Sequence, residues 1–600
     1  MRWFSAIPTA VVLLAGAGTV VGALAFAWLV VWLLLLSLGS FLLGPDSPLD
    51  PLTISAPVAF GPPALATIAT IVLTWRALPP FGEWRMRLLV WERDAAPQSR
   101  FDPSLPLTVG LLVLGYVGFV AYERLVYLFH RIHGAIDEGL YLYAGRMVMS
   151  GSLPYRDFYF DQAPLLPFAF GLALAPFHYN EIAARLFAMG CTALTLLLAF
   201  WTAARLGGRL AGLIAFALLV TNLDFLPEVS AGVTANGSLT ALVAVLAVLA
   251  LTYDQLAVAL ILACVAAGLR QVFVPLPIVV AVYVAVVRRR PWEALLLGLV
   301  PFVAIYLGFL AFGGPAAPYG LIPPLRAAYV VRDASPSGFH YELLSYRDQA
   351  MHVFTAYLPF WLCAGPLAFL MFRRGHPHGR LLAVLATACA LILLANIFPY
   401  IGNPRYPVSQ LPLVAILGGV AAATVLRRAD PATARPALGA GLAMIVAAAP
   451  LLAFRESTFV DEFHTRPPLA RFLAASDYVS SIAPPNATLL TLETPFATQT
   501  GLRLPHGLEA GSWGVYKGIS DEQAKQLNVV TYKMLADMVE AGAGDVVIES
   551  DHYGMVKNYI QNDDQKARME DGLKKNYELK ETFGQVSDWG DVRVWVRKQS

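Results

Sequence analysis

Charged residues are scarce in this chain. Only 14% of its 600 residues are Asp, Glu, Lys or Arg, whereas 57% are hydrophobic, and soluble domains carry about 25% charged residues. The net charge is +2, and no concentrated basic face is present that would neutralise phosphates, which argues against a nucleic-acid partner. The composition therefore indicates a protein of the lipid bilayer.

Cysteine and lysine are also sparse. The four cysteines all lie inside apolar runs, where a thiol behaves as a small apolar side chain, and their spacing fits neither a metal site nor a disulfide framework. All nine lysines lie between Lys517 and Lys598. This shift in composition predicts a membrane part that ends near residue 456 and a soluble tail.

Long apolar runs fill the membrane part. A spanning helix needs about 20 apolar residues, and such runs predict about 13 spanning helices. The runs cover residues 9–43, 56–75, 106–129, 186–204, 210–223, 237–252, 255–269, 272–287, 292–313, 352–372, 381–399, 407–426 and 436–454. We read the first as a retained membrane anchor and expect an all-α polytopic membrane domain.

Arginines in the connections set the expected orientation, because cytoplasmic connections retain positive charge. The arginine-bearing connections alternate with arginine-poor or mixed ones, and they are 76–100, 205–209, 288–290, 373–380 and 427–435. We expect these in the cytoplasm. The opposite connections and everything after about residue 456 are then outside, which places the long, aromatic loop 130–185 outside the cell.

The tail predicts a small α/β domain. Helical periodicity alternates with short β-rich runs, in the order 468–482 (helix), 488–493 (strand), 520–541 (helix), 545–549 (strand), helix to 576, and 591–598 (strand). It has no glycine-rich phosphate loop and no nucleophile elbow. The expected domains are anchor helices and a cytoplasmic linker over 1–104, a membrane catalytic domain over 105–456 and an extracytoplasmic α/β domain over 457–600.

The loop 130–185 opens with adjacent carboxylates, Asp137 and Glu138. A carboxylate at a poorly solvated membrane boundary is hard to ionise unless cations or hydrogen bonds compensate, and such a group is a candidate general base. The alternative is that the pair caps an interfacial helix, since acidic residues stabilise a helix N-terminus.

Two histidines precede this pair. His130 and His133 lie about one helical turn apart and, with Asp137, have a spacing that could hold a divalent metal. Interfacial histidines are common and the sequence offers no fourth ligand. We therefore expect no certain cofactor and keep His130 and His133 as weak metal candidates.

The order of motifs in this region resembles the GT-C superfamily of lipid-phosphate-sugar glycosyltransferases, which includes protein O-mannosyltransferases and the aminoarabinose transferases that act on lipid A. The resemblance covers roughly residues 106 to 430. The matching residues are Asp137-Glu138, Tyr141, Gly151, Pro154-Tyr155, Asp157-Phe158, Pro164-Leu165-Leu166-Pro167, Arg185-Leu186, Leu269-Arg270-Gln271 and Arg405-Tyr406-Pro407.

This resemblance implies catalytic roles at the outer surface. Asp137, with Glu138 beside it, is expected to be the base or to bind the acceptor. Arg270 and Arg405 are expected to bind the donor phosphate, because guanidinium forks match phosphate oxygens. The alternative role for these two arginines is snorkelling to lipid headgroups or pairing with acidic neighbours.

Other polar and aromatic residues near the outer surface of the membrane are expected to bind substrate. Tyrosines there could stack on sugar rings, whereas the alternative is an aromatic belt at the membrane interface. The expected substrate-binding residues are Tyr141, Arg146, Tyr155, Asp157, Gln271 and Tyr406.

The sequence therefore predicts a multi-pass plasma-membrane glycosyltransferase with an extracytoplasmic active site. It would move a sugar from a polyprenyl-phosphate donor to a lipid, glycan or protein hydroxyl, with inversion. No nucleotide-binding pattern occurs in the outside segments, which favours a lipid donor. The alternatives are a polytopic transporter, although transporters tend to place polar residues at mid-membrane, and a non-catalytic membrane protein that binds envelope glycans.

Overall fold

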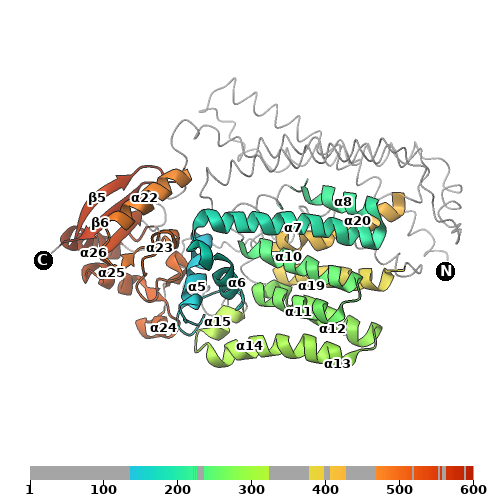
Figure 1. The fold of residues 1–600 in the computed structure, drawn as a ribbon. Helices are drawn as coiled ribbons and strands as arrows, with labels where there is room; N and C mark the ends of the chain where they lie inside the picture. Colours follow the sequence, from blue (N-terminus) through green and yellow to red (C-terminus); the bar gives the residue numbers. More distant parts are fainter. Residues whose placement is uncertain are drawn as a thin grey trace, which may run out of the picture.

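The computed structural model describes residues 135–220, 222, 225, 235–322, 377–397, 406–426, 468–516, 519–551, 554–556, 563–586 and 590–598. Within these ranges, the protein consists of a helical bundle and a C-terminal α/β domain that lies at one end of the bundle (Figure 1). The small α/β region that the tail composition predicts is confirmed.

Three elements open the described part: α5 (Ala135–Met149), α6 (Leu166–Leu174) with the short η2 (Ala175–Phe177), and α7 (Glu181–Gly207). Helix α7 starts at Glu181 because the side chain of Asn180 accepts hydrogen bonds from the N–H groups of Ile182 and Ala183. It ends where Gly208 adopts a positive φ of 80°. At 27 residues, α7 is longer than the predicted run 186–204.

The other elements of the bundle are mostly apolar helices. They are α8 (Arg209–Val220), α10 (Ala235–Thr252), α11 (Leu256–Leu269), η3 (Gln271–Phe273), α12 (Pro275–Val282), η4 (Tyr283–Val287), α13 (Pro291–Ala294), η5 (Leu295–Leu299), α14 (Val300–Phe312), α15 (Ala317–Leu321), α19 (Gly379–Ile397), η7 (Tyr406–Gln410) and α20 (Leu411–Leu426). Small residues let them approach closely: a Cβ on Gly419 of α20 would collide with the Ala211 carbonyl of α8.

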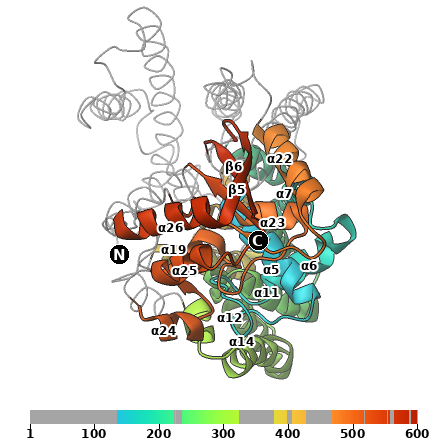
Figure 2. The same cartoon turned by 90° about the vertical axis from the view of Figure 1, so that its left-hand side faces the viewer.

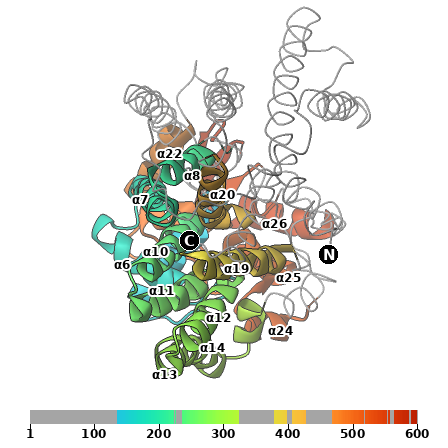
Figure 3. The same ribbon diagram turned by 90° about the vertical axis from the view of Figure 1, so that its right-hand side faces the viewer.

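Three of the described helical segments are long and apolar enough to cross a membrane: Glu181–Gly207, Pro291–Phe312 and Gly379–Asn396. Six shorter apolar segments accompany them. The apolar window of Pro291–Phe312 is only 6% buried, and α13 and α14 lie at one edge of the bundle when it is viewed along its helices (Figure 3). The predicted spans 9–43, 56–75, 106–129, 352–372 and 436–454 lie outside the described residues.

The two ends of the bundle differ. At the domain-bearing end, α5 contacts the start of α7 through Glu138 and Arg185, and the loop after α5 reaches the end of α11, where Leu165 N–H donates to the Gly268 carbonyl over 2.8 Å. At the opposite, arginine-rich end, Arg205 of α7 binds Thr252 at the end of α10. The described arginine connections 205–209 and 288–290 lie at this second end, where Arg288 pairs with Asp254.

The C-terminal domain contains a four-stranded sheet of order β1-β4-β6-β5, in which β1 and β4 are parallel and β6 is antiparallel to both of its neighbours. In Figure 2, α22 and α26 flank strands β5 and β6. The elements are α22 (Pro468–Ile482), β1 (Leu489–Leu490), α23 (Thr494–Thr500), η9 (Gly511–Gly514), β2 (Val515–Tyr516), α24 (Asp521–Gln526), β3 (Val530–Thr531), α25 (Tyr532–Glu540), β4 (Val546–Ser550), α26 (Asp563–Asn576), β5 (Tyr577–Phe583) and β6 (Val592–Arg597).

The predicted continuous helix 520–541 is wrong in its middle. Asn528 adopts a left-handed φ of 56°, and the β-branched residues Val530 and Thr531 form β3, which pairs in parallel with β2. Thr531 then caps α25, since its side chain accepts from Met534 N–H. Two helices separated by a strand therefore replace the single one.

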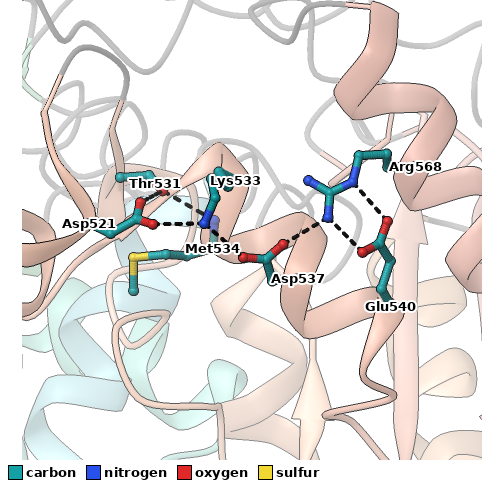
Figure 4. A network of polar contacts seen from close by, with 7 residues as sticks. All are labelled: Asp521, Thr531, Lys533, Met534, Asp537, Glu540 and Arg568. Atoms are coloured by element: carbon teal, nitrogen blue, oxygen red, sulfur yellow. Dashed lines mark hydrogen bonds and ion pairs between the residues drawn. The ribbon is translucent and has the colours of Figure 1, made fainter.

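Ion pairs connect the helices around this strand (Figure 4). Lys533 lies 2.9 Å from Asp521 and 3.2 Å from Asp537, and Arg568 of α26 lies 2.8 Å from Asp537 and 2.6 Å from Glu540. These side chains are largely exposed, so each pair contributes little by itself. Lys533 joins α25 to α24, and Arg568 joins α26 to α25.

Hydrophobic packing joins the bundle and the C-terminal domain. Tyr143 of α5 belongs to the core of the C-terminal domain, and Met147 and Ile182 pack against that core. In the reverse direction, Tyr516 and Leu527 of the C-terminal domain belong to the core of the bundle. The C-terminal domain therefore packs directly against the end of the bundle through shared hydrophobic contacts.

Candidate active site

Helix α5 carries the predicted catalytic pair. It begins at Ala135, so Asp137 and Glu138 lie in its first turn, where the helix dipole favours acidic side chains. The side chain of Asp137 falls outside the described structure, as do His130 and His133. Their predicted roles therefore stay predictions.

Glu138 is part of a buried cluster of charges. Nη2 of Arg185 donates to Oε2 of Glu138 over 3.1 Å and lies 3.5 Å from Oε1 of Glu181. The three residues are at most 4% exposed. Removing Arg185 from this group would leave buried carboxylates without their cation, so the cluster holds the first turn of α5 against the start of α7.

Sequence reasoning gave Arg185 and Glu181 no role in this site. A signal was present, because Glu181 and Arg185 are spaced i,i+4 at the start of an otherwise apolar helix, where charged side chains are costly unless paired or functional. The partner on α5 was not predictable from spacing, since Glu138 and Arg185 are 47 residues apart.

Tyr141 lies in an aromatic cluster. Its ring stacks on Phe170 with centroids 6.5 Å apart and meets Phe160 edge-on at 6.5 Å, and it is 5% exposed. This packing gives the side chain a role in the core at the domain-bearing end. Sugar binding by Tyr141 stays a prediction.

Arg146 connects α5 to the C-terminal domain. Its Nη1 donates to the carbonyl oxygens of Ala497 and Leu502, each over 3.1 Å, and its Nη2 donates to the Gly501 carbonyl. All three carbonyls lie at or just after the end of α23, where a cation also complements the helix dipole. The structure thus gives Arg146 a connecting role that the sequence did not predict.

Tyr155 and Asp157 shape the loop that follows α5. Tyr155 is 1% exposed, has a left-handed φ of 68°, and donates from its hydroxyl to the Gln162 carbonyl over 2.6 Å. Asp157 accepts from Leu153 N–H over 2.7 Å and from Arg156 over 2.8 and 2.7 Å. The hydrogen bonds from Arg156 hold the pKa of Asp157 below its usual value.

The C-terminal domain forms hydrogen bonds with the same loop. The Asn528 side chain donates to the carbonyl oxygens of Tyr155 and Arg156 over 2.8 and 3.0 Å. Tyr516 donates from its hydroxyl to that of Tyr159 over 2.9 Å. The loop is therefore enclosed between the bundle and the α/β domain.

Arg270 and Gln271 lie where α11 ends. Arg270 adopts an extended conformation, is 6% exposed, and donates from Nη1 to the Ser409 hydroxyl of η7 over 3.4 Å. Nε2 of Gln271 lies 3.3 Å from the carbonyl oxygens of Asp161 and Gly320. This places Gln271 against the loop after α5 and puts Arg270 beside η7.

The remaining predicted residues are described only in part. Tyr406 begins η7, but its side chain and all of Arg405 lie outside the described residues. Within the described part of the chain, no group of three or more His, Cys, Asp or Glu side chains could hold a metal ion.

Solved structures with the same arrangement, a bundle of apolar helices with an α/β domain packed over one end, have the GT-C fold. The chain shares this fold with ArnT from Cupriavidus metallidurans. The apo ArnT structure is 16% identical with a TM-score of 0.52, over 82% of this chain and 98% of ArnT.

Two further solved structures are similar. ArnT bound to undecaprenyl phosphate is 17% identical with a TM-score of 0.50, over 81% of this chain and 98% of ArnT. The oligosaccharyltransferase from Archaeoglobus fulgidus, tethered to an acceptor peptide, is 13% identical with a TM-score of 0.45, over 81% of this chain and 74% of the archaeal one. No protein-family model and no curated protein matches the chain.

Proposed function

We propose that this protein is a membrane glycosyltransferase that moves a sugar from a polyprenyl-phosphate donor to a hydroxyl group of a lipid, glycan or protein acceptor. The reaction would take place at the domain-bearing end, which we assign to the extracytoplasmic side of the plasma membrane. The fold supports a polyprenyl-phosphate donor, because it is shared with ArnT, which has been determined with undecaprenyl phosphate bound.

One observation carries the proposal: a buried arginine, Arg270, lies at the end of an apolar helix on the same end of the bundle as the acidic first turn of α5. A guanidinium in this position can bind an anionic phosphate through its planar fork of N–H donors. Arg270 and Arg405 would bind the donor phosphate, and Ser409 would orient the Arg270 side chain through their hydrogen bond.

In the proposed reaction, the acceptor hydroxyl gives its proton to Asp137 and its oxygen attacks the anomeric carbon of the sugar. The bond from that carbon to the lipid phosphate breaks, and the electron pair leaves on the phosphate. Arg270 and Arg405 stabilise the negative charge that develops there. Attack from the face opposite the phosphate inverts the anomeric centre.

The buried ion pair distinguishes the two carboxylates of α5. Because Arg185 holds Glu138 in a buried ion pair, we assign the base to Asp137 and give Glu138 the task of positioning the first turn. We further propose that the loop after α5 and the η3–η7 contact frame the substrate site. Their predicted contributors are Tyr141, Arg146, Tyr155, Asp157, Gln271 and Tyr406.

The test compares envelope glycolipids and glycoproteins by mass spectrometry in cells that lack the gene and in cells complemented with variants. We expect Asp137→Asn to abolish the product while inserting normally into the membrane. Asp254→Asn is the control, since Asp254 is an exposed carboxylate at the arginine-rich end, and it should retain the product. Full activity of Asp137→Asn would remove the base from position 137 and contradict the mechanism.

A further inference from the structure

Among the described residues, the arginine-rich end holds more positive charge than its carboxylates neutralise. Asp254 pairs with Arg288 at 2.5 Å, and Glu293 pairs with Arg290 at 2.9 Å. In the part of the chain that the structure describes, no carboxylate lies within ion-pair distance of the other arginines at this end, which are Arg205, Arg209, Arg289 and Arg380.

Arg205 is held in place at this end. Its guanidinium carbon lies 3.7 Å from the centroid of the Tyr253 ring, its Nε donates to the Thr252 hydroxyl over 3.3 Å, and its Nη2 donates to the Thr252 carbonyl over 3.2 Å. The ring is fixed in turn, because Trp201 Nε1 donates to the Tyr253 hydroxyl over 2.9 Å. A guanidinium fixed in this way loses little further freedom when it binds an anion.

Further basic residues lie at the same end of the bundle as Arg205. Arg209 follows four residues later, after a turn in which Gly208 has a φ of 80°. His378 lies close enough that the charge of Arg205, after burial, helps to lower its pKa, and Arg380 follows in the first turn of α19. Helices α8 and α19 both begin here, so their first N–H groups add to the positive potential.

An apolar stripe leads along α7 to these cations. Leu194, Leu197 and Trp201 are 50%, 60% and 54% exposed, and they share a face of the helix with Arg205 because their spacing is close to whole helical turns. If α7 crosses the membrane, the stripe faces the hydrocarbon region, and the aromatic pair of Trp201 and Tyr253 near the end of α7 lies toward the interface that such rings prefer.

We propose that this end binds an anionic phospholipid, with the headgroup phosphate on Arg205, Arg209 and Arg380 and one acyl chain along the α7 stripe. A soluble anion would use the cations alone, whereas the adjacent stripe adds a surface for a lipid tail. The site is separate from the proposed active site and does not depend on the proposed function.

The test uses the full-length protein in mixed micelles that contain equal amounts of phosphatidylglycerol and phosphatidylcholine, and counts retained lipids by native mass spectrometry. We expect preferential retention of phosphatidylglycerol. Arg205→Gln should weaken it about fivefold, since one basic residue at an anionic surface contributes about 1 kcal/mol. Arg209→Gln should act in the same direction without disturbing the contacts of Arg205 with Tyr253 and Thr252.

Arg290→Gln is the matched control, because it removes the same charge at the same end from a residue that already pairs with Glu293. It should leave retention near that of the wild type. Equal losses in the Arg205, Arg209 and Arg290 variants would show diffuse attraction and overturn the site. Equal retention of both lipids, or displacement of the lipid by millimolar inorganic phosphate, would also overturn it.

Discussion

Nη2 of Arg185 lies 3.1 Å from Oε2 of Glu138, and the two side chains are 2% and 4% exposed. This ion pair joins the first turn of α5 to the start of α7 across 47 residues of sequence. Because Glu138 directly follows Asp137, the pair also limits where the proposed base can move. The contact therefore connects the stability of the bundle to the geometry of the proposed reaction.

Replacing Arg185 should be more damaging than replacing Glu138. Arg185→Met leaves two buried carboxylates without their cation, and we expect a loss of about 3–5 kcal/mol. Glu138→Gln leaves Arg185 with Glu181, which lies 3.5 Å away, so its loss should be smaller. Thermal unfolding of the purified proteins in detergent measures both, and equal losses would show that Glu181 does not share the charge of Arg185.

Helix α5 touches the C-terminal domain at a glycine. A Cβ on Gly139 would collide with Thr494 and Pro495 at the start of α23, so we expect Gly139→Ala to destabilise the joint by about 1–3 kcal/mol through overpacking. Gly190→Ala on α7 is the control, because no atom lies within 4 Å of the added Cβ. It should be neutral or stabilising by about 0.5–1 kcal/mol, as measured by thermal unfolding. Similar effects of the two changes would contradict the close contact.

The three hydrogen bonds of Arg146 should be sensitive to the shape of its side chain. Lysine keeps the charge but cannot reach three carbonyls with a planar fork, so we expect Arg146→Lys to weaken this joint by about 1.5–3 kcal/mol. Hydrogen exchange of residues 494–504 in the full-length protein reports the change. Unchanged exchange combined with lost transfer would instead favour the substrate-binding role that the sequence predicts.

Glu493 should make stability depend on pH. Its carboxylate is buried and accepts from the hydroxyls of Ser550 and Thr491, and burial raises its pKa. The folded state therefore holds the proton more tightly than the unfolded state, in which the value is about 4.3. Stability contributed by the neutral form is then lost as pH rises through the folded pKa.

Glu493→Gln should flatten this decline when thermal unfolding is followed from about pH 5 to about pH 8. A second group acts with the same sign, since the hydrogen bond to Glu509 raises the pKa of His506. That contribution is complete below about pH 6.5 and disappears as His506 loses its proton. The variant His506→Gln removes the contribution of His506 and so separates it from that of Glu493. If Glu493→Gln leaves the dependence of stability on pH unchanged, Glu493 does not titrate in this range.

The apolar helices were the most predictable part of the fold. Apolar length alone predicted runs at 237–252 and 255–269, and the structure has α10 at Ala235–Thr252 and α11 at Leu256–Leu269. The strand β5 was not predicted, because three apolar residues in its seven alternate with several charged ones and most of the strand is exposed at the sheet edge. Its pairing with β6 is a tertiary contact that local pattern does not reveal.

The candidate site was predictable in outline only. The acidic pair and Arg270 follow from the rarity of charge near apolar runs, and the structure places Glu138 and Arg270 in buried surroundings at the domain-bearing end. The partners were not predictable, because Arg146 meets residues of α23 more than 350 positions away and Arg270 meets Ser409 at a separation of 139. Such long-range pairings depend on the tertiary fold of the whole chain.

Tyr143 has a consequence for biosynthesis. Its hydroxyl accepts from Leu504 N–H, 361 residues later in the chain, and its ring belongs to the core of the C-terminal domain. Because translation proceeds from the N-terminus, α5 emerges long before the surface that covers it has been made. Tyr143 is therefore exposed until the C-terminal domain has been synthesised. A truncated product that ends before α23 would leave this part of α5 accessible to chaperones and proteases.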